Sequence, residues 1–180
     1  MNEDIKFLSI NVAVVTISDT RTLENDKSGD VLEKRIKQAG HIVLAREIVQ
    51  DEFKKISSLF SNLIKDKKID VIISTGGTGL TGRDITPEVM EMLFEKSIDG
   101  FGEMFRWMSY KKIGTSALQS RALAGVANGT YIFCLPGSPS ACRDGWDDIL
   151  VHQLDIRHKP CNFVEIMPRL QEHKYFRTKN

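Results

Sequence analysis

The residues best suited to do chemistry lie in one glycine-rich stretch, Ser74–Glu88, with the sequence STGGTGLTGRDITPE. Glycine lets backbone N–H groups converge on an anion without interference from side chains. The stretch follows a short apolar run, Asp70–Ser74, so these N–H groups are expected where a buried strand ends. Phosphate, pyrophosphate or a carboxylate could bind there. The alternative is a tight glycine turn that binds no ligand.

Two common nucleotide motifs fit this stretch poorly. Its glycines have the G-x-G-x-x-G spacing of a dinucleotide-binding turn, but that turn should lead straight into a helix. Here the expected helix begins only at Pro87, and no strand with a terminal acidic residue follows soon after. A P-loop requires Gly-Lys-Ser/Thr, whereas the nearby cation is Arg83. An NAD(P)-dependent oxidoreductase is therefore the weakest of the functional alternatives.

Two aspartates could place negative charge beside this stretch. Asp84 precedes a helix that we expect Thr86 to cap, and its structural alternative is a local Asx turn. Asp51 follows an expected strand, and its alternative is stronger because aspartate is a good helix N-cap. If both strands are central in a sheet, the two carboxylates face one pocket. Such a pair beside a polyphosphate suits Mg²⁺, which takes one or two protein oxygens and completes its shell with water and phosphate.

A second turn of small residues, Leu135–Pro139, follows another apolar strand and begins a helix. It would place Ser138 and several backbone N–H groups at the same edge of the sheet, with the positive end of a helix behind them. Taken alone, the turn is better explained as an ordinary connection between a strand and a helix.

The elements that must position these residues alternate along the chain. Strands are predicted at residues 12–17, 41–49, 70–74 and 131–135, and the helices that follow them are predicted to start near Ser28, Asp51, Pro87 and Ser138. This alternation predicts an α/β fold, with a mostly parallel central sheet and helices on both faces. Ligands bind such sheets at the carboxyl ends of the strands.

The composition is that of an ordinary protein domain: 180 residues, of which 41% are apolar and 27% charged. One domain over residues 1–180 is expected, with residues 171–180 as a flexible tail. The net charge of +1 gives no basic excess for nucleic acid or an anionic membrane. Without a targeting signal or a membrane-spanning run, we expect a cytosolic protein. Three cysteines without C-x-x-C spacing, Cys134, Cys142 and Cys161, are expected to be reduced thiols.

Three motifs in this order and spacing carry a resemblance to a known family. They are T-G-G-T-G at Thr75–Gly79, D-I-T-P-E at Asp84–Glu88 and P-G-S-P at Pro136–Pro139. Together they resemble the MoaB/Mog family, which contains molybdenum cofactor biosynthesis protein B and the molybdopterin adenylyltransferases. The resemblance extends from Val12 to about Phe163, and the stretch Gln119–Asn128 looks closer to the protein B branch.

The resemblance implies a three-layer α/β/α sandwich and a homotrimer or homohexamer. It further implies adenylylation of molybdopterin: its terminal phosphate is joined to the α-phosphate of ATP, with Mg²⁺, and pyrophosphate is released. Other molybdenum cofactor enzymes are expected partners. A non-catalytic protein that binds molybdopterin or a precursor in the same pathway is the alternative, because some bacterial members of the protein B branch lack the first of two family aspartates and are inactive as adenylyltransferases.

The resemblance also assigns roles to individual residues. The two family aspartates correspond to Asp51 and Asp84, which this chain keeps as expected catalytic residues and Mg²⁺ ligands. The residues expected to bind nucleotide phosphates are Thr75, Gly76, Gly77, Thr78, Gly79, Ser116, Gly137 and Ser138. The residues expected to bind molybdopterin are Ser18, Asp19, Ser28, Gly29 and Arg121.

The segment Phe101–Tyr110 is expected to be a helix with apolar residues on two sides. One face is predicted to carry Phe101, Met104, Phe105 and Met108, while Trp107 and Tyr110 point elsewhere. Because the resemblance implies an oligomer, we expect this helix to meet a partner subunit.

Overall fold

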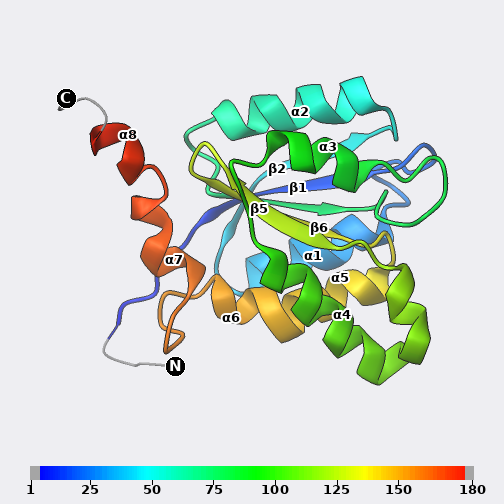
Figure 1. Cartoon of the computed structure of the whole chain (residues 1–180). Coiled ribbons are helices and arrows are strands. Elements are labelled where there is room, and N and C mark those ends of the chain that lie inside the picture. Colours follow the sequence, from blue (N-terminus) through cyan, green and yellow to red (C-terminus); the bar gives the residue numbers. More distant parts are fainter. Residues whose placement is uncertain (1–4, 177–180) are drawn as a thin grey trace.

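A mostly parallel six-stranded sheet forms the centre of the computed structural model, which describes residues 5–176 (Figure 1). Its strands are β1 (Asn11–Ile17), β2 (Ile42–Val49), β3 (Val71–Thr75), β4 (Lys96–Ser97), β5 (Leu123–Ala127) and β6 (Thr130–Leu135). They lie in the order β2-β1-β3-β6-β5-β4. The first four in this order run parallel, whereas β5 pairs antiparallel with β6 and β4 pairs antiparallel with β5. The predicted mostly parallel sheet is confirmed.

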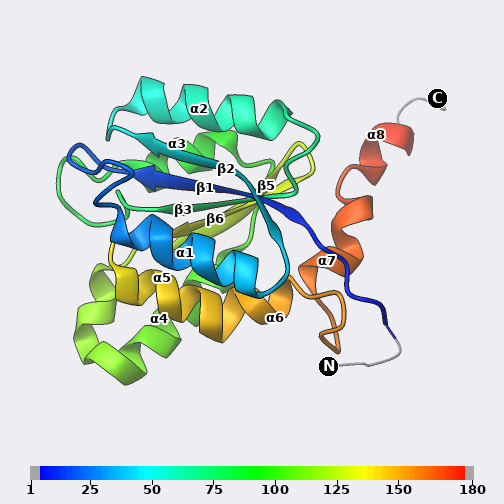
Figure 2. The same ribbon diagram turned by 180° about the vertical axis from the view of Figure 1, so that it is seen from behind.

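Helices cover both faces of the sheet, so the predicted three-layer α/β/α arrangement is confirmed. One face carries α2 (Phe53–Lys65) and α3 (Thr86–Leu93), and the other carries α1 (Lys27–Gln38), α4 (Asp99–Ile113), α5 (Pro139–Gly145) and α6 (Val151–Gln153) (Figures 1 and 2). A 3₁₀ turn η1 (Gly114–Gln119) follows α4, and a π-helical turn η2 (Trp146–Leu150) joins α5 to α6. No helix between residues 5 and 176 has the length and apolar character that a membrane crossing requires.

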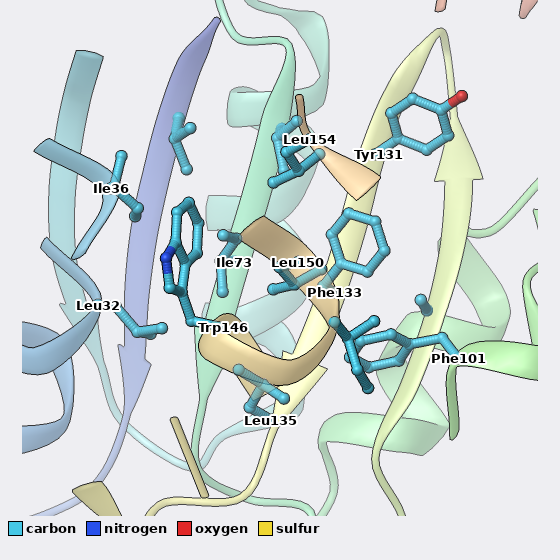
Figure 3. Packing of buried hydrophobic residues seen from close by; sticks show 14 of the residues in the cluster. Leu32, Ile36, Ile73, Phe101, Tyr131, Phe133, Leu135, Trp146, Leu150 and Leu154 are labelled. Carbon is cyan, nitrogen blue, oxygen red and sulfur yellow. The ribbon is translucent and has the colours of Figure 1, made fainter. Parts of the chain in front are cut away.

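The central strands are apolar along their whole length because both of their faces are buried. In β6, Tyr131 and Phe133 point into the cluster around Trp146, which Figure 3 shows from close by. Ile132 points to the opposite face, where it belongs to the cluster that contains Phe60 of α2. All of these side chains are less than 3% exposed. The burial of both faces of the sheet therefore explains the continuous apolar runs in the sequence.

The antiparallel hairpin of β5 and β6 was not predicted. Its turn, Asn128-Gly129, has φ angles of 49° and 85°, which is the geometry that favours Asn-Gly in two-residue hairpins. The β5 strand is difficult to recognise because it is rich in small residues. One of them, Gly125, lies against Phe94, and a Cβ atom there would come within 2.3 Å of the phenyl ring. The Asn128-Gly129 dipeptide is the sequence signal from which this hairpin could have been predicted.

The sequence expectation for the start of α1 needs correction. Ser28 is not the N-cap of α1, because the N-cap is Asp26, two residues earlier, whose side chain accepts a 3.0 Å hydrogen bond from the N–H of Gly29. The tail expected to be flexible from residue 171 contains α8 (Glu172–Phe176), preceded by α7 (Phe163–Ile166) and η3 (Met167–Arg169). Gln171 and Lys174 both donate to Asn128 Oδ1, at 2.9 and 3.0 Å. Residues 177–180 lie outside the described residues.

His41 should make the stability of the fold sensitive to mildly acidic pH. Its ring is 5% exposed between Phe7 and Trp146, and Nδ1 accepts a 3.4 Å hydrogen bond from the N–H of Ile10. Burial lowers the pKa of His41, with Asp155 opposing this and Arg157 adding to it. The unfolded chain then binds the proton more readily, so the free energy of unfolding should fall as the pH drops through about 6.5.

The measurement is denaturant unfolding at about pH 7.5 and about pH 5.5, on either side of the ordinary histidine pKa. The comparison is with His41→Asn, which keeps an acceptor near the position of Nδ1 but does not titrate. This variant should be less stable overall, because it loses the ring contacts, and should lose less stability between the two pH values. An equal pH dependence in both proteins would contradict the prediction.

Candidate functional site

The candidate site lies where the four parallel strands end, on the right of Figure 1. The segments that leave these strands are Ser18–Asp19 after β1, Gln50–Asp51 after β2, Gly76–Asp84 after β3 and Pro136–Ser138 after β6. The strands are paired in parallel register up to their last residues, so all four segments meet at one edge of the sheet. The structure therefore gathers most of the predicted site residues at this edge.

The segment Gly76–Asp84, which we call the glycine loop, packs so closely against β1 that it requires glycine at its start. Gly76 has a φ angle of +103°, and a Cβ atom there would lie 2.1 Å from the carbonyl oxygen of Ile17. Gly77 has a φ angle of +63°, and its Cβ would meet Thr86 Oγ1 at 2.3 Å. Both positions therefore exclude a side chain. Gly82, in contrast, has open space around it.

The amides of the loop differ in what they can bind. The N–H of Gly76 donates to Leu135 O at 3.0 Å, so its predicted role as a phosphate donor is wrong. The N–H groups of Gly77 and Thr78 form no hydrogen bond with another part of residues 5–176. Thr75 likewise faces the protein, because its hydroxyl donates to Pro136 O at 2.9 Å. The N–H groups of Gly77 and Thr78, at the start of the loop, are therefore available to an anion.

Asp51 is not a helix cap, so the main structural alternative for this residue is wrong. The helix α2 begins at Phe53, with Glu52 at its N-cap position and no side-chain capping bond. The N–H of Asp51 donates to Asp19 Oδ1 at 3.2 Å. Asp51 Oδ1 lies 3.0 Å from the point where a Cβ of Gly77 would be, so the carboxylate faces the glycine loop.

Asp84 closes the glycine loop from its other end. Its Oδ2 accepts hydrogen bonds from the N–H and the hydroxyl of Thr81, at 2.8 and 2.7 Å. The same oxygen lies 2.7 Å from the point where a Cβ of Gly79 would be. Thr86 does not cap α3 as predicted, because Ile85 holds that position; its hydroxyl donates to Gly76 O at 2.9 Å instead. Asp51 and Asp84 thus face glycines that are two residues apart.

The two carboxyl groups differ in how easily they ionise. Burial, followed by the nearby charges of Asp19 and Asp84, raises the pKa of Asp51, which Arg83 only partly offsets. Burial also acts to raise the pKa of Asp84, but hydrogen bonds from Thr81 and from the Gly79 amide lower it overall. Asp51 forms no ion pair within residues 5–176. A cation next to Asp51 would remove the repulsion between these carboxylates.

The carboxylates fit a magnesium ion better than a metal held by protein ligands alone. Among residues 5–176 no group of three or more His, Cys, Asp or Glu side chains could hold a metal ion. Magnesium needs only one or two carboxylates when substrate phosphates and water supply the rest of its shell. Asp51 and Asp84 satisfy this requirement in number and type, so the assignment of both as Mg²⁺ ligands remains a prediction.

A cavity of about 610 Å³ opens beside the glycine loop, between that loop, η1 and the start of α5. Five of the eight residues predicted to bind phosphates line it: Thr78, Gly79, Ser116, Gly137 and Ser138. Ser138 is also the N-cap of α5, where its hydroxyl accepts a 3.1 Å hydrogen bond from the N–H of Ala141. The predicted second turn therefore both starts a helix and faces the cavity.

Sequence reasoning missed two cations of this cavity, Lys112 and Arg143. Lys112 pairs with Asp144 and Asp148, at 2.8 and 2.7 Å. Arg143 forms no ion pair within residues 5–176, so its charge is available to a ligand. No local signal distinguishes these two from other surface cations, because they reach the cavity only through the packing of α4, which carries Lys112, beside α5, which carries Arg143. Ser109 and Ser140 line the same cavity and were also missed.

The residues predicted to bind molybdopterin do not lie together. Ser18 and Asp19 line a separate hollow of about 440 Å³ near β2, where Asp19 forms a bidentate ion pair with Arg83. Ser28 and Gly29 are buried in the first turn of α1, and Ser28 donates to Gly137 O at 2.9 Å. Arg121 hydrogen bonds to the glycine loop. Ser28 therefore helps to hold the Pro136–Ser138 turn in place, and Ser28 and Gly29 lie behind this turn in the protein interior.

The buried cysteine beside the site has a structural role. Cys142 of α5 lies 3.1 Å from Thr75 Oγ1, and burial raises the pKa of its thiol to about 11. It therefore stays protonated at neutral pH and is a poor nucleophile. All three cysteines of the chain are free, as predicted.

The fold and the site together define a class of protein: a three-layer α/β protein with a candidate anion-binding site, flanked by two aspartates, at the carboxyl edge of its sheet. Residues 13–156 match the family described as "Probable molybdopterin binding domain". The chain belongs to this family, and several curated relatives carry the name molybdenum cofactor biosynthesis protein B.

The relatives match over nearly their whole length. Molybdenum cofactor biosynthesis protein B of Escherichia coli is 46% identical over 158 residues, which cover 88% of this chain and 93% of the relative. The protein of the same name from Bacillus cereus is 42% identical over 146 residues, 81% of this chain and 86% of the relative. A crystal structure of molybdenum cofactor biosynthesis protein B superposes with a TM-score of 0.83 at 38% identity, covering 92% of this chain and 98% of the other.

Proposed function

We propose that the chain is a Mg²⁺-dependent molybdopterin adenylyltransferase. The observation that carries the proposal is the position of Asp51 and Asp84, whose carboxylates flank one glycine loop beside the 610 Å³ cavity. Membership of a molybdenum cofactor biosynthesis family supports the pathway, and the molybdopterin-binding description supports the acceptor. The retained Asp51 supports the transferase over a non-catalytic binding protein.

The reaction would be an in-line substitution at phosphorus. A terminal phosphate oxygen of molybdopterin forms a bond to the α-phosphorus of ATP, the bond from that phosphorus to the bridging oxygen breaks, and pyrophosphate leaves with the electron pair. Such chemistry depends on positioning and on neutralising charge. A bound Mg²⁺, held by Asp51 and Asp84, would neutralise charge on the phosphate oxygens.

The chain's own groups would position the phosphates. The N–H groups of Gly77 and Thr78 would donate to phosphate oxygens at the loop, and the hydroxyls of Ser116 and Ser138 would donate from the opposite wall of the cavity. Arg143 adds a cation that no carboxylate of the described chain neutralises. The hollow at Ser18 and Asp19 remains our expected location for the pterin.

The deciding experiment is an adenylylation assay with purified molybdopterin, ATP and Mg²⁺, which follows pyrophosphate and the adenylylated product. The proposal expects both to form in equal amounts and only when Mg²⁺ is added. Binding of molybdopterin without consumption of ATP would replace it with the non-catalytic binding protein. Saturable NAD(P) binding without either result would favour the oxidoreductase.

We also propose a homo-oligomer, trimer or hexamer, in which α4 meets a neighbouring subunit. Of the residues predicted to share one face of this helix, Phe101 and Phe105 are buried, whereas Met104 is 50% exposed. Trp107 and Tyr110 are 61% and 60% exposed. Large apolar side chains gathered on one helix are typical of a surface that binds another protein. The cytosol and other molybdenum cofactor enzymes stay our predicted location and partners.

A charge at this surface should break the oligomer. We expect Trp107→Glu to elute as a smaller species than the wild type in size-exclusion chromatography with light scattering, because burying an unpaired carboxylate in an apolar interface is costly. The matched control is Met92→Glu: the Met92 side chain is 74% exposed, and α3, which carries this residue, covers the opposite face of the sheet from α4. A wild-type mass for Trp107→Glu would exclude α4 from the interface.

A further inference from the structure

Arg121, in the connection between η1 and β5, hydrogen bonds to both ends of the loop segment that carries Asp84. Its Nε donates to Gly79 O at 2.7 Å, and its Nη2 donates to Asp84 O at 2.7 Å. Its Nη1 donates to the carboxylate of Glu88 in the first turn of α3, and its backbone N–H donates to Thr78 O at 3.1 Å. One residue therefore joins the start of the segment, its end and the helix that follows.

A guanidinium group is suited to hold two carbonyl oxygens at a fixed separation. It is planar, its N–H donors point in fixed directions, and hydrogen bonds from a charged donor are stronger than neutral ones. The Glu88 carboxylate is 52% exposed, so the ion pair itself contributes little and mainly orients the group. The carbonyl oxygens of Gly79 and Asp84 are the contacts that a lysine at this position could not both keep.

These contacts determine where the Asp84 carboxylate lies. The carboxylate is held inside the segment by the N–H and hydroxyl of Thr81, and the N–H of Asp84 donates back to Thr81 O at 3.0 Å. The segment from Gly79 to Asp84 is therefore a small closed unit. The guanidinium of Arg121 fastens both of its ends to the rest of the fold.

Arg121 does not contact the large cavity, although Ser116, Gln119 and Ser120 from the same part of the chain line it. Three of its side-chain N–H groups already bind protein oxygens. We infer that Arg121 is a positioning residue, which holds the Gly79–Asp84 segment closed and thereby sets the place of the Asp84 carboxylate, and does not itself bind a substrate phosphate. The effect of Arg121 on catalysis rests on the proposed function, whereas the effect of Arg121 on the loop does not.

The test is Arg121→Lys, a change that keeps the positive charge and removes the planar fork. In the ligand-free protein, hydrogen exchange followed by NMR or mass spectrometry should be about tenfold faster at the amides of Thr81 and Asp84, the effect expected from the loss of one charged hydrogen bond. Exchange in β1 and β6 should be unchanged. Arg169→Lys is the matched control, because Arg169 forms an exposed pair with Glu172 far from the loop in the sequence.

A second measurement uses Mn²⁺ as a spectroscopic substitute for Mg²⁺. Mn²⁺ binding in the presence of ATP should weaken by about tenfold in Arg121→Lys, while ATP binding without metal changes little. Unchanged amide exchange at Thr81 and Asp84, with or without weaker binding of ATP, would overturn the inference, and weaker ATP binding would identify Arg121 as a ligand contact. If Arg121→Lys does not fold, Glu88→Gln gives the same test with a smaller expected change.

The two proposals can fail separately. A wild-type protein that does not adenylylate molybdopterin would end the proposed function, yet faster loop exchange in Arg121→Lys would still establish the positioning role. If Arg121→Lys adenylylates molybdopterin normally and its Thr81 and Asp84 amides exchange as slowly as in the wild type, only the positioning role would be excluded.

Discussion

The Asp51→Asn variant should fold as well as the wild type and lose adenylylation by about a hundredfold or more. Asparagine keeps the size of the side chain but is a poor Mg²⁺ ligand. Asp51 caps no helix and forms no ion pair within residues 5–176, so the change removes no stabilising contact of its side chain. Burial and the charges of Asp19 and Asp84 raise the pKa of Asp51, so the neutral amide should leave the melting temperature unchanged or slightly higher.

The measurement is turnover of molybdopterin at saturating ATP, with Mn²⁺ binding as an independent readout. Glu52→Gln is the matched control, since this neighbouring carboxylate is exposed and paired with Lys55 at 2.9 Å. It should retain normal turnover. Unchanged turnover in Asp51→Asn would remove Asp51 from the mechanism, and a large fall in melting temperature would show that the residue has a structural role after all.

Gly76→Ala should destabilise the protein by about 3 kcal/mol or more, the range for severe backbone strain combined with a clash. A methyl group there would lie 2.1 Å from the carbonyl oxygen of Ile17, and the backbone has a φ angle of +103°. The oxygen belongs to the end of a central strand and cannot move away cheaply. The same displacement would shift Gly77, so adenylylation should be lost as well.

The matched control is Gly82→Ala in the same loop. Nothing lies within 4 Å of a Cβ atom at this position, and the φ angle is not in the left-handed region. The free energy of unfolding should be unchanged or should rise by about 0.4–1 kcal/mol, because alanine reduces the entropy of the unfolded chain. Denaturant unfolding of both variants measures the difference. Equal stability of the two variants would contradict the packing of the glycine loop against β1.

The contrast between Gly76 and Gly82 also bears on the dinucleotide motif. In that motif the third glycine permits close packing between the helix and the strand. Here a Cβ atom at Gly82 would have nothing within 4 Å, and α3 begins four residues later at Thr86. The G-x-G-x-x-G spacing is therefore a formal match without the geometry that gives the motif its function.

The amino-acid sequence by itself determined the layers of this protein and the edge at which its site lies. Strands that are apolar along their whole length must be covered on both faces, and parallel strands must end at one edge, so Asp51, the glycine loop and Ser138 could be brought together without coordinates. The N-caps at Ser28, Asp51 and Thr86 were wrong because several neighbouring polar residues can each begin a helix, and packing selects among them.

Only the tertiary structure decided which groups at this edge are available. The N–H of Gly76 donates to Leu135 O, and the guanidinium of Arg121 donates to the glycine loop, although the sequence predicted that both residues bind a ligand. Lys112 and Arg143 reach the cavity because α4 and α5 pack side by side over the sheet. Contacts between residues far apart in the chain depend on how the helices cross the sheet, and no local pattern of residue types records that crossing.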